Sequence, residues 1–176
     1  MANEKHKRFA WAVEVLDVRP DDNILEIGCG VGLAVEEIAE RLTTGKIMAI
    51  DRSATMIAKA ISRNQISIAS GKATFVKTDL LSFPKEGISF NKIFFFNINF
   101  FWTQNSITAE VSVIRSSLAK KGLVYIFYGP MLGEGFKTIN NSVRRNLKNE
   151  KLRVIKTVQH KAIKCCCFIA TDDFSA

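Results

Sequence analysis

Three glycines lie between a short apolar run and a stretch with helical spacing in residues 23–40, NILEIGCGVGLAVEEIAE. Gly28, Gly30 and Gly32 are spaced two residues apart. Glycine has no side chain, so a ligand can approach its backbone closely, and it adopts positive φ without steric cost. In doubly wound α/β folds, ligands bind at a glycine turn beyond the carboxyl end of the first strand. The segment therefore predicts a strand, a ligand-binding turn and a helix, in that order.

The spacing of these glycines argues against a nicotinamide dinucleotide. The dinucleotide fingerprint places glycines at its first, third and sixth positions. Counted from Gly28, the sixth position is Leu33, and the third glycine comes one residue early, at Gly32. Because a glycine pattern alone is weak evidence, a nicotinamide-dependent oxidoreductase stays open as an alternative.

Helical and strand patterns alternate along the chain. A first helix is predicted over 4–17, and the following RPDDN turn ends it. Ser53 and Ser106 are predicted helix caps, and Gly45 and Gly122 are predicted helix stops. The seven predicted strands are 24–27, 46–50, 73–79, 92–97, 123–128, 152–160 and 163–171. The predicted helices after the first are 31–42, 54–63, 105–120 and 135–149.

This alternation predicts an α/β protein with three layers and a doubly wound, mostly parallel sheet of seven strands. The early strands are apolar throughout, as expected for a sheet that is buried on both faces. Almost nothing separates the last two strands, so they should form an antiparallel C-terminal hairpin. With 176 residues and no linker or repeat, residues 1–176 are expected to form one domain.

The positive charge of the chain is concentrated in one segment. The net charge is +8, and residues 137–164 hold nine Lys or Arg against one acidic residue, Glu150, so this segment accounts for the whole excess. Two interpretations are open: a solvated face on a helix and an edge strand, or a surface that binds phosphate or RNA.

No apolar run reaches the roughly 20 residues of a membrane span. The richest one, IFFFNINFFW at 93–102, is interrupted by two asparagines. The charged N-terminus lacks the apolar core of a secretory signal. We therefore expect a cytoplasmic protein with no membrane partner.

Three of the four cysteines are consecutive, Cys165, Cys166 and Cys167, whereas zinc sites usually pair cysteines as CxxC. Consecutive residues of a strand point to opposite faces, so the three thiols cannot converge on one ion. The triplet is expected to be buried and reduced, and no metal site is predicted.

Acidic residues mark the tips of the first three predicted strands: Glu26 in ILEIGCGVG, Asp51 in IMAIDRS and Asp79 in FVKTDLLSF. With the FNKIFFFNINFFW segment and the seven-strand pattern, these motifs resemble class I S-adenosylmethionine-dependent methyltransferases over essentially the whole chain. Two positions depart from the family. Asn91 replaces its common Asp, and NINF is not the Asn/Asp-Pro-Pro-aromatic motif typical of methylation on nucleic-acid bases or glutamine.

The resemblance implies S-adenosylmethionine as the cofactor and S-adenosylhomocysteine as the product. Glu26 would hold the ammonium of the amino-acid end, directly or through water. Asp51 would accept hydrogen bonds from both ribose hydroxyls, Asp79 would accept one from the adenine amine, and the Leu80 amide would serve a ring nitrogen. The implied cofactor-binding residues are Glu26, Gly28, Gly30, Gly32, Asp51, Arg52, Asp79, Leu80 and Asn97.

No residue identifies itself as a catalytic base, so the catalytic residues stay unknown. The candidates for orienting a methyl acceptor are Asn97 and Asn99 near the tip of the fourth strand, Tyr128 at the end of the fifth, and His6. His6 lies in the N-terminal helix, and residues 1–18 are expected to border the substrate edge. The aromatic run 100–102 either walls the substrate site or packs in the core.

We expect methyl transfer to a small-molecule acceptor by a monomer or a homodimer. One alternative is an RNA-directed methyltransferase, or an RNA-binding protein, that uses the basic 137–164 segment. Another alternative is a module that holds the cofactor without transferring its methyl group.

Overall fold

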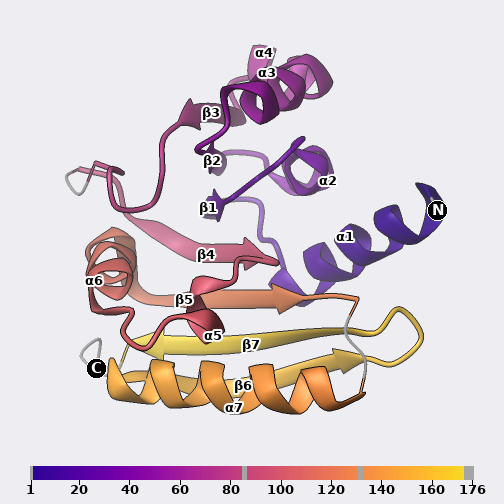
Figure 1. Ribbon diagram of the computed structural model, residues 1–176. Helices are drawn as coiled ribbons and strands as arrows, with labels where there is room; N and C mark the ends of the chain where they lie inside the picture. Colours follow the sequence, from indigo (N-terminus) through magenta and orange to yellow (C-terminus); the bar gives the residue numbers. More distant parts are fainter. Residues whose placement is uncertain (1, 85–86, 131–132, 173–176) are drawn as a thin grey trace.

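The computed structural model describes the chain except residues 1, 85–86, 131–132 and 173–176 (Figure 1). The helices are α1 (Ala2–Leu16), α2 (Leu33–Arg41), α3 (Ala54–Arg63), α4 (Gln65–Ala69), α5 (Phe100–Thr103), α6 (Thr108–Ser117) and α7 (Gly133–Asn149). The strands are β1 (Asn23–Ile27), β2 (Lys46–Asp51), β3 (Ala73–Lys77), β4 (Phe90–Phe96), β5 (Leu118–Tyr128), β6 (Leu152–His160) and β7 (Cys165–Asp172).

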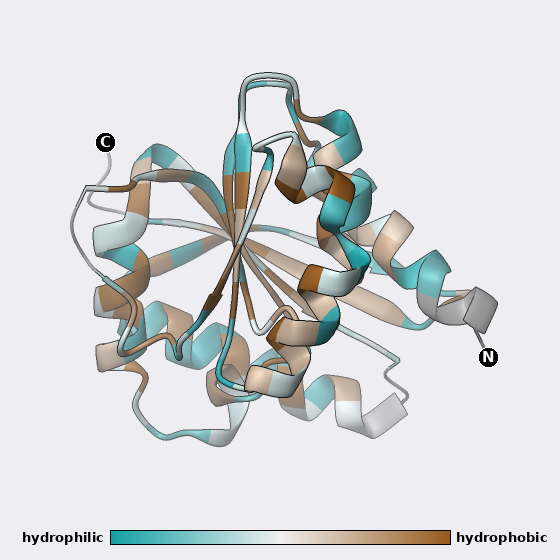
Figure 2. Ribbon diagram, turned by 90° about the horizontal axis from the view of Figure 1, so that it is seen from above, coloured by the Kyte–Doolittle hydropathy of each residue, from teal (hydrophilic) through white to brown (hydrophobic). Residues whose placement is uncertain are grey.

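The strands form one seven-stranded sheet in the order β3-β2-β1-β4-β5-β7-β6. The pairs from β3 to β5 are parallel, and β7 runs antiparallel to both of its neighbours. Viewed from above, the strands fan about a common centre with helices on both sides (Figure 2). The predicted doubly wound sheet and its antiparallel C-terminal hairpin are confirmed.

Two hydrophobic clusters fill the spaces between the sheet and its helices. One lies under α5, α6 and α7 and includes Phe101 and Leu147, and the other lies under α1, α2 and α3 and includes Trp11 and Val35. Neighbouring residues of a strand alternate between them. Cys166 belongs to the first cluster, whereas Cys165 and Cys167 belong to the second. The cysteine triplet is thus buried, unpaired and divided between two faces, as predicted.

The structure corrects the helix expected over 105–120. Helix α6 begins at Thr108, and its cap residue is Ile107, which makes no side-chain cap bond, so Ser106 is not the cap. The helix ends at Ser117, because residues 118–121 extend β5 and Leu118 pairs with Phe90 of β4. Gly122 therefore lies inside β5. Pairing between segments distant in sequence outweighs the local helical pattern here.

Gly45 does not end a helix as predicted, because α2 stops at Arg41 with Leu42 as its extended cap residue. The N–H of Gly45 donates to the carbonyl of Pro20 at 3.0 Å, and a Cβ added to Gly45 would lie 2.3 Å from the carbonyl oxygen of Asp22. Gly45 is required instead for close approach of two loops. Ser53 caps α3 as predicted, since its hydroxyl accepts the N–H of Met56.

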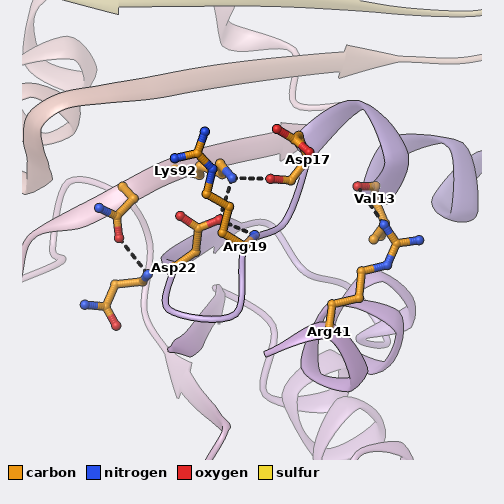
Figure 3. Close-up of polar contacts among 8 residues, drawn as sticks. Val13, Asp17, Arg19, Asp22, Arg41 and Lys92 are labelled. Carbon is orange, nitrogen blue, oxygen red and sulfur yellow. Dashed lines mark hydrogen bonds and ion pairs between the residues drawn. The ribbon is translucent and has the colours of Figure 1, made fainter. Parts of the chain in front are cut away.

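A buried ion pair fastens the amino-terminal ends of β1 and β4 (Figure 3). The Lys92 ammonium contacts the Asp22 carboxylate and donates to the carbonyl of Asp17 at 2.6 Å. The same carboxylate accepts the N–H of Arg19 at 2.8 Å. This network lies at the end of the strands opposite the glycine turn, so it stabilises the fold away from the functional site. No described helix is long and apolar enough to cross a bilayer.

Candidate active site

The glycine turn connects β1 to α2 in a backbone conformation that other residues rarely adopt. Gly28, Gly30 and Gly32 have φ angles of 80°, 55° and 71°. The N–H of Gly28 donates to the carbonyl of Ile50 at 2.8 Å, which ties the turn to the end of β2. A Cβ on Gly28 would lie 2.4 Å from Cδ1 of Ile98, whereas one on Gly30 would meet nothing within 4 Å. The turn is therefore packed on one side and bare on the other.

Two cavities lie on either side of this turn, and Gly28 and Asn97 line both of them. The larger has a volume of about 820 Å³ and the smaller about 240 Å³. The larger cavity falls within the range of small-molecule and cofactor sites. Its walls include the tips of β2 and β4, the segment after β3, and the start of α5.

Asp51, at the end of β2, supports the turn and faces the larger cavity. Its Oδ2 accepts the N–H of Gly30 at 2.9 Å, and its Oδ1 accepts the N–H of Ser53 at 2.8 Å. A carboxylate has about four acceptor positions, so two further hydrogen bonds can form. These contacts hold the carboxylate in a fixed orientation at the cavity wall. Such an oxygen pair can accept bonds from two neighbouring hydroxyls of a ligand.

Asp79 follows β3 and is exposed at the edge of the same cavity. Its Oδ1 accepts the N–H of Ser82 at 2.7 Å. Hydrogen bonds from Ser82, and to a smaller extent the charge of Arg52, lower the pKa of Asp79. The side chain is therefore an ionised acceptor. Leu80, which is buried, and the exposed Arg52 also line the cavity.

Glu26 is the most perturbed carboxyl group near the turn. Its side chain is 2% exposed, and its Oε2 has no hydrogen-bond partner. Burial, and secondarily the charge of Asp51, raise the pKa of Glu26 to about 8. It lines the smaller cavity. A buried titratable group with an unsatisfied oxygen at a cavity wall is suited to bind a cationic ligand group.

The smaller cavity also has walls that the sequence motifs did not identify. They come from Arg8 and Phe9 of α1 and from Phe96 of β4. The rings of Phe9 and Phe96 lie 4.9 Å apart between centroids, and Nη1 of Arg8 donates to the carbonyl of Gly129 at 3.2 Å. Arg8 and Phe9 reach the site only because α1 docks against the strand tips, whereas Phe96 is the last residue of β4. No local pattern around Arg8 indicates this.

Asn97 and Tyr128, two acceptor-orienting candidates, are engaged with the protein itself. The Asn97 amide donates to the carbonyl of Gly129 at 2.7 Å, and its oxygen accepts the Gly129 N–H at 2.9 Å. The hydroxyl of Tyr128 donates to the carbonyl of Ile98 at 2.8 Å, and burial raises the pKa of this tyrosine. The structure gives both side chains a bracing role between the tips of β4 and β5.

The other two candidates lie at the surface. Asn99 is exposed and lines the larger cavity. His6 is exposed on α1 and lines neither cavity. In the aromatic run, Phe101 is fully buried, while Phe100 lines the larger cavity. The run therefore contributes to both the core and the site.

The residues at the strand tips fit S-adenosylmethionine. Glu26, with its unsatisfied buried oxygen, suits the ammonium, and Asp51, with two acceptor positions left, suits the ribose. The ionised Asp79 suits the adenine amine, and the bare Gly30 leaves backbone surface open beside them. Among the described residues, no cluster of His, Cys, Asp and Glu could hold a metal ion.

Comparison with known proteins identifies the family. A family model described as "Methyltransferase domain" matches residues 24–122, from β1 to the early part of β5. The chain belongs to the class I S-adenosylmethionine-dependent methyltransferases. Its cofactor is S-adenosylmethionine, and membership in this family removes the nicotinamide alternative.

Individual methyltransferases agree with this assignment. The Bacillus subtilis (strain 168) protein named "Putative methyltransferase YrhH" is 24% identical over 158 residues, which cover 90% of this chain and 82% of that protein. A methyltransferase structure from Aquifex aeolicus is 15% identical and covers 92% of this chain and 88% of its own, with a TM-score of 0.75. Magnesium protoporphyrin IX methyltransferase from Synechocystis PCC 6803, solved with bound S-adenosylmethionine, is 17% identical. The match covers 97% of this chain and 80% of that chain, with a TM-score of 0.73. Both structures share the fold of this methyltransferase.

Proposed function

We propose that this methyltransferase holds its cofactor across the tips of β3, β2 and β1 and methylates a small-molecule acceptor. The observation that carries this placement is the line of three carboxyl groups facing the two cavities: Asp79, Asp51 and Glu26. They provide acceptors for the adenine, the ribose and the ammonium, in that order. The Leu80 amide and the bare turn at Gly30 complete the proposed site.

The other proposed cofactor contacts follow from position. Gly28 and Gly32 shape the turn, Arg52 lies beside Asp51 at the cavity wall, and Asn97 lines both cavities while it braces the β5 tip. Asn99 is the remaining candidate for contact with the acceptor, because it is exposed at the cavity and its amide is not needed to brace the strand tips.

The cofactor supplies a methyl group that is already activated on a sulfonium. The chain therefore needs mainly to align donor and acceptor, and such alignment is worth up to about 7–11 kcal/mol in intramolecular reactions. The negative charges of Asp51 and Asp79 favour a cationic cofactor at this edge of the sheet. A base is required only when the acceptor must lose a proton.

A small acceptor is supported by the shape and lining of the site. Ile98 and Phe100 give the larger cavity an apolar side, and Phe9 and Phe96 do the same for the smaller one. Apolar walls with a few polar groups are typical of small-molecule sites. The Synechocystis neighbour, whose name describes methylation of a porphyrin, has the same fold. We further propose that residues 1–176 act as one cytoplasmic domain, as a monomer or a homodimer, with α1 at the substrate edge.

RNA is the second candidate acceptor because the basic segment 137–164 presents exposed cations. Arg145 and Lys148 of α7 are exposed, as are Lys156 of β6 and Lys161 in the turn that follows it. The segment includes β6, which forms the sheet edge opposite β3. An RNA acceptor would have to reach from this surface to the tips of β1 and β2. Its binding would weaken steeply with rising salt.

The test is formation of S-adenosylhomocysteine from S-adenosylmethionine in the presence of acceptor pools. The purified protein is incubated separately with a small-metabolite extract and with total RNA, and Asp51→Asn serves as the impaired control. We expect turnover with the metabolite pool and a large loss in Asp51→Asn. Turnover with RNA alone, suppressed by salt, would contradict the small-molecule proposal and favour the second candidate.

A further inference from the structure

Charge is unevenly distributed at the carboxyl end of the sheet, where the parallel strands end. Glu26, Asp51 and Asp79 lie near the tips of β1, β2 and β3. In contrast, residues 135–171 contain a single acidic residue, Glu150. Glu150 lies between α7 and β6, at the opposite end of the strands. This segment therefore contributes only cations and neutral groups to the carboxyl end of the sheet.

The turn between β6 and β7 lies at this carboxyl end. Tyr128, the last residue of β5, pairs with Cys166 of β7, and Cys165 pairs with His160, the last residue of β6. The turn at 161–164 is therefore level with the tip of β5. Figure 1 shows it on the same side of the molecule as the arrowheads of β4 and β5.

Gly129 connects this turn to the proposed site. Its carbonyl and N–H are hydrogen-bonded to the Asn97 amide at 2.7 and 2.9 Å, and Asn97 lines both cavities. A Cβ added to Gly129 would lie 2.2 Å from Sγ of Cys165, the residue that follows the turn. Neighbouring strands are about 4.8 Å apart, so the turn lies about 10–15 Å from the tip of β4, a distance that a small molecule can span.

The turn presents two cations close together. Lys161 and Lys164, the ends of the KAIK sequence, are both exposed. The N–H of Lys164 donates to the carbonyl of Lys161 at 3.3 Å, which closes the turn. Arg8 of α1, whose Nη1 donates to the Gly129 carbonyl at 3.2 Å, adds positive charge beside the tip of β5. Like charges held close together repel, and a bound anion relieves that repulsion.

We propose that the methyl acceptor carries a carboxylate or a phosphate monoester, and that this anionic group binds to Lys161 and Lys164. The inference rests on the proposed function and names the class of its acceptor. Both anions accept charge-assisted hydrogen bonds from ammonium groups. The two lysines line neither cavity, so the acceptor extends from the cofactor near Asn97 across the tip of β5 to the turn. The acidic strand tips favour the cationic cofactor, and the basic turn favours an anionic acceptor.

Activity on anionic and non-anionic metabolites tests this class. A metabolite extract, cleared of RNA by ultrafiltration, is separated on an anion-exchange resin into a retained and an unretained fraction. Formation of S-adenosylhomocysteine from S-adenosylmethionine over a dilution series of each fraction gives an apparent KM and kcat. Phosphatase treatment of the retained fraction then distinguishes the two anions, because it abolishes turnover only where the acceptor carries the phosphate monoester.

A pair of charge reversals tests the two lysines. Lys161→Glu with Lys164→Glu is compared with the wild type and with Arg145→Glu with Lys148→Glu. The second variant is a matched control, because it makes the same change of charge at exposed positions near the carboxyl end of α7, away from the turn. Titration calorimetry with S-adenosylhomocysteine verifies that each variant is folded and keeps its cofactor site. Where the reversal in the turn fails to fold, Lys161→Gln with Lys164→Gln replaces it.

We expect turnover with the retained fraction. The reversal in the turn should raise the apparent KM about 5- to 50-fold, because each reversal removes a weak exposed attraction and adds a repulsion of similar size. Its kcat and its affinity for S-adenosylhomocysteine should change less than about twofold, as should the KM of the control, because charges farther away than a Debye length are screened. Rising salt should raise the KM of the wild type and not that of the reversal in the turn.

Three results would overturn the inference. Turnover confined to the unretained fraction would show that the acceptor lacks the anionic group, while the proposed methyltransferase activity would stand. An unchanged KM in the turn variant, or an equal rise in the control, would show that the two lysines do not bind the acceptor. No turnover with either fraction, in a protein that still binds S-adenosylhomocysteine, would contradict the small-molecule acceptor itself, which separates that failure from an error about the charge of the acceptor.

Discussion

Replacing Glu26 with glutamine should stabilise the ligand-free protein in a manner that depends on pH. Burial and the nearby Asp51 raise the pKa of Glu26 from 4.5 to about 8. Between these pH values the folded protein retains a proton that the unfolded chain releases. The stability that Glu26 contributes is therefore full below pH 4.5 and is lost as the pH rises through 8.

The size of the effect follows from the shift. A pH of 7 is about 2.5 units above 4.5, the ordinary pKa at which the carboxyl titrates in the unfolded chain. Each unit is worth about 1.4 kcal/mol, so about 3 kcal/mol of stability is lost by pH 7. Glutamine has nearly the same shape and does not titrate. The stability of Glu26→Gln relative to the wild type should thus increase by about 3 kcal/mol between pH 4.5 and pH 7.

Urea unfolding of both proteins at pH 4.5, 6, 7 and 8 measures this difference. Glu40→Gln, which changes an exposed glutamate of α2, is the matched control and should follow the wild type at every pH. A stability difference between Glu26→Gln and the wild type that stays constant with pH would refute the reasoning, because Glu26 would then not hold a proton in the folded state.

Glu26→Gln should weaken cofactor binding even though it stabilises the ligand-free protein against unfolding. An amide cannot form the charged pair with the ammonium, so we expect weaker binding of S-adenosylhomocysteine by about 10- to 100-fold. Wild-type binding at pH 7 should release about one proton as Glu26 ionises against the ammonium, and Glu26→Gln should release none. Calorimetry in buffers with different ionisation enthalpies measures this release.

Three further variants test the roles of residues outside the cofactor contacts. Tyr128→Phe removes one buried hydrogen bond and should cost about 1 kcal/mol in urea unfolding, with the affinity for S-adenosylhomocysteine unchanged. Lys92→Ala leaves its aspartate partner buried without a counter-charge and should cost about 3–5 kcal/mol, again with no effect on affinity in the folded fraction. The double reversal Arg145→Glu with Lys148→Glu spares Arg144, whose guanidinium donates a hydrogen bond to Thr157 of β6. It should leave cofactor affinity intact, because Arg145 and Lys148 lie on α7 and line neither cavity. A collapse of affinity would contradict the placement of the site.

The gathering of Glu26, Asp51 and Asp79 at one edge of the sheet was predictable from sequence because its signals are local. Each of Glu26, Asp51 and Asp79 lies within a few residues of the end of an apolar strand, and parallel strands bring their carboxyl ends to one edge of the sheet. The glycine spacing marks the turn between them. These features require no knowledge of how distant segments pack.

The features that sequence did not predict depend on packing between distant segments. Leu118 joins β5 because it pairs with Phe90 across 28 positions, which no helical pattern over 105–120 can indicate. The side chain of Tyr128 turns to the carbonyl of Ile98 instead of the cavity. Arg8 reaches the site only because α1 docks on the strand tips. The two short helices α4 and α5 have too few residues to show a period.

The central claim is that the carboxyl groups at the strand tips hold S-adenosylmethionine, and Asp51 tests it most directly. Calorimetric titration with S-adenosylhomocysteine should give one site per chain in the wild type. Asp51→Asn should weaken binding about 10- to 100-fold, while Asp21→Asn, an exposed aspartate in the loop before β1, should bind as the wild type does. Equal affinity of Asp51→Asn and the wild type, with both proteins folded, would contradict the account.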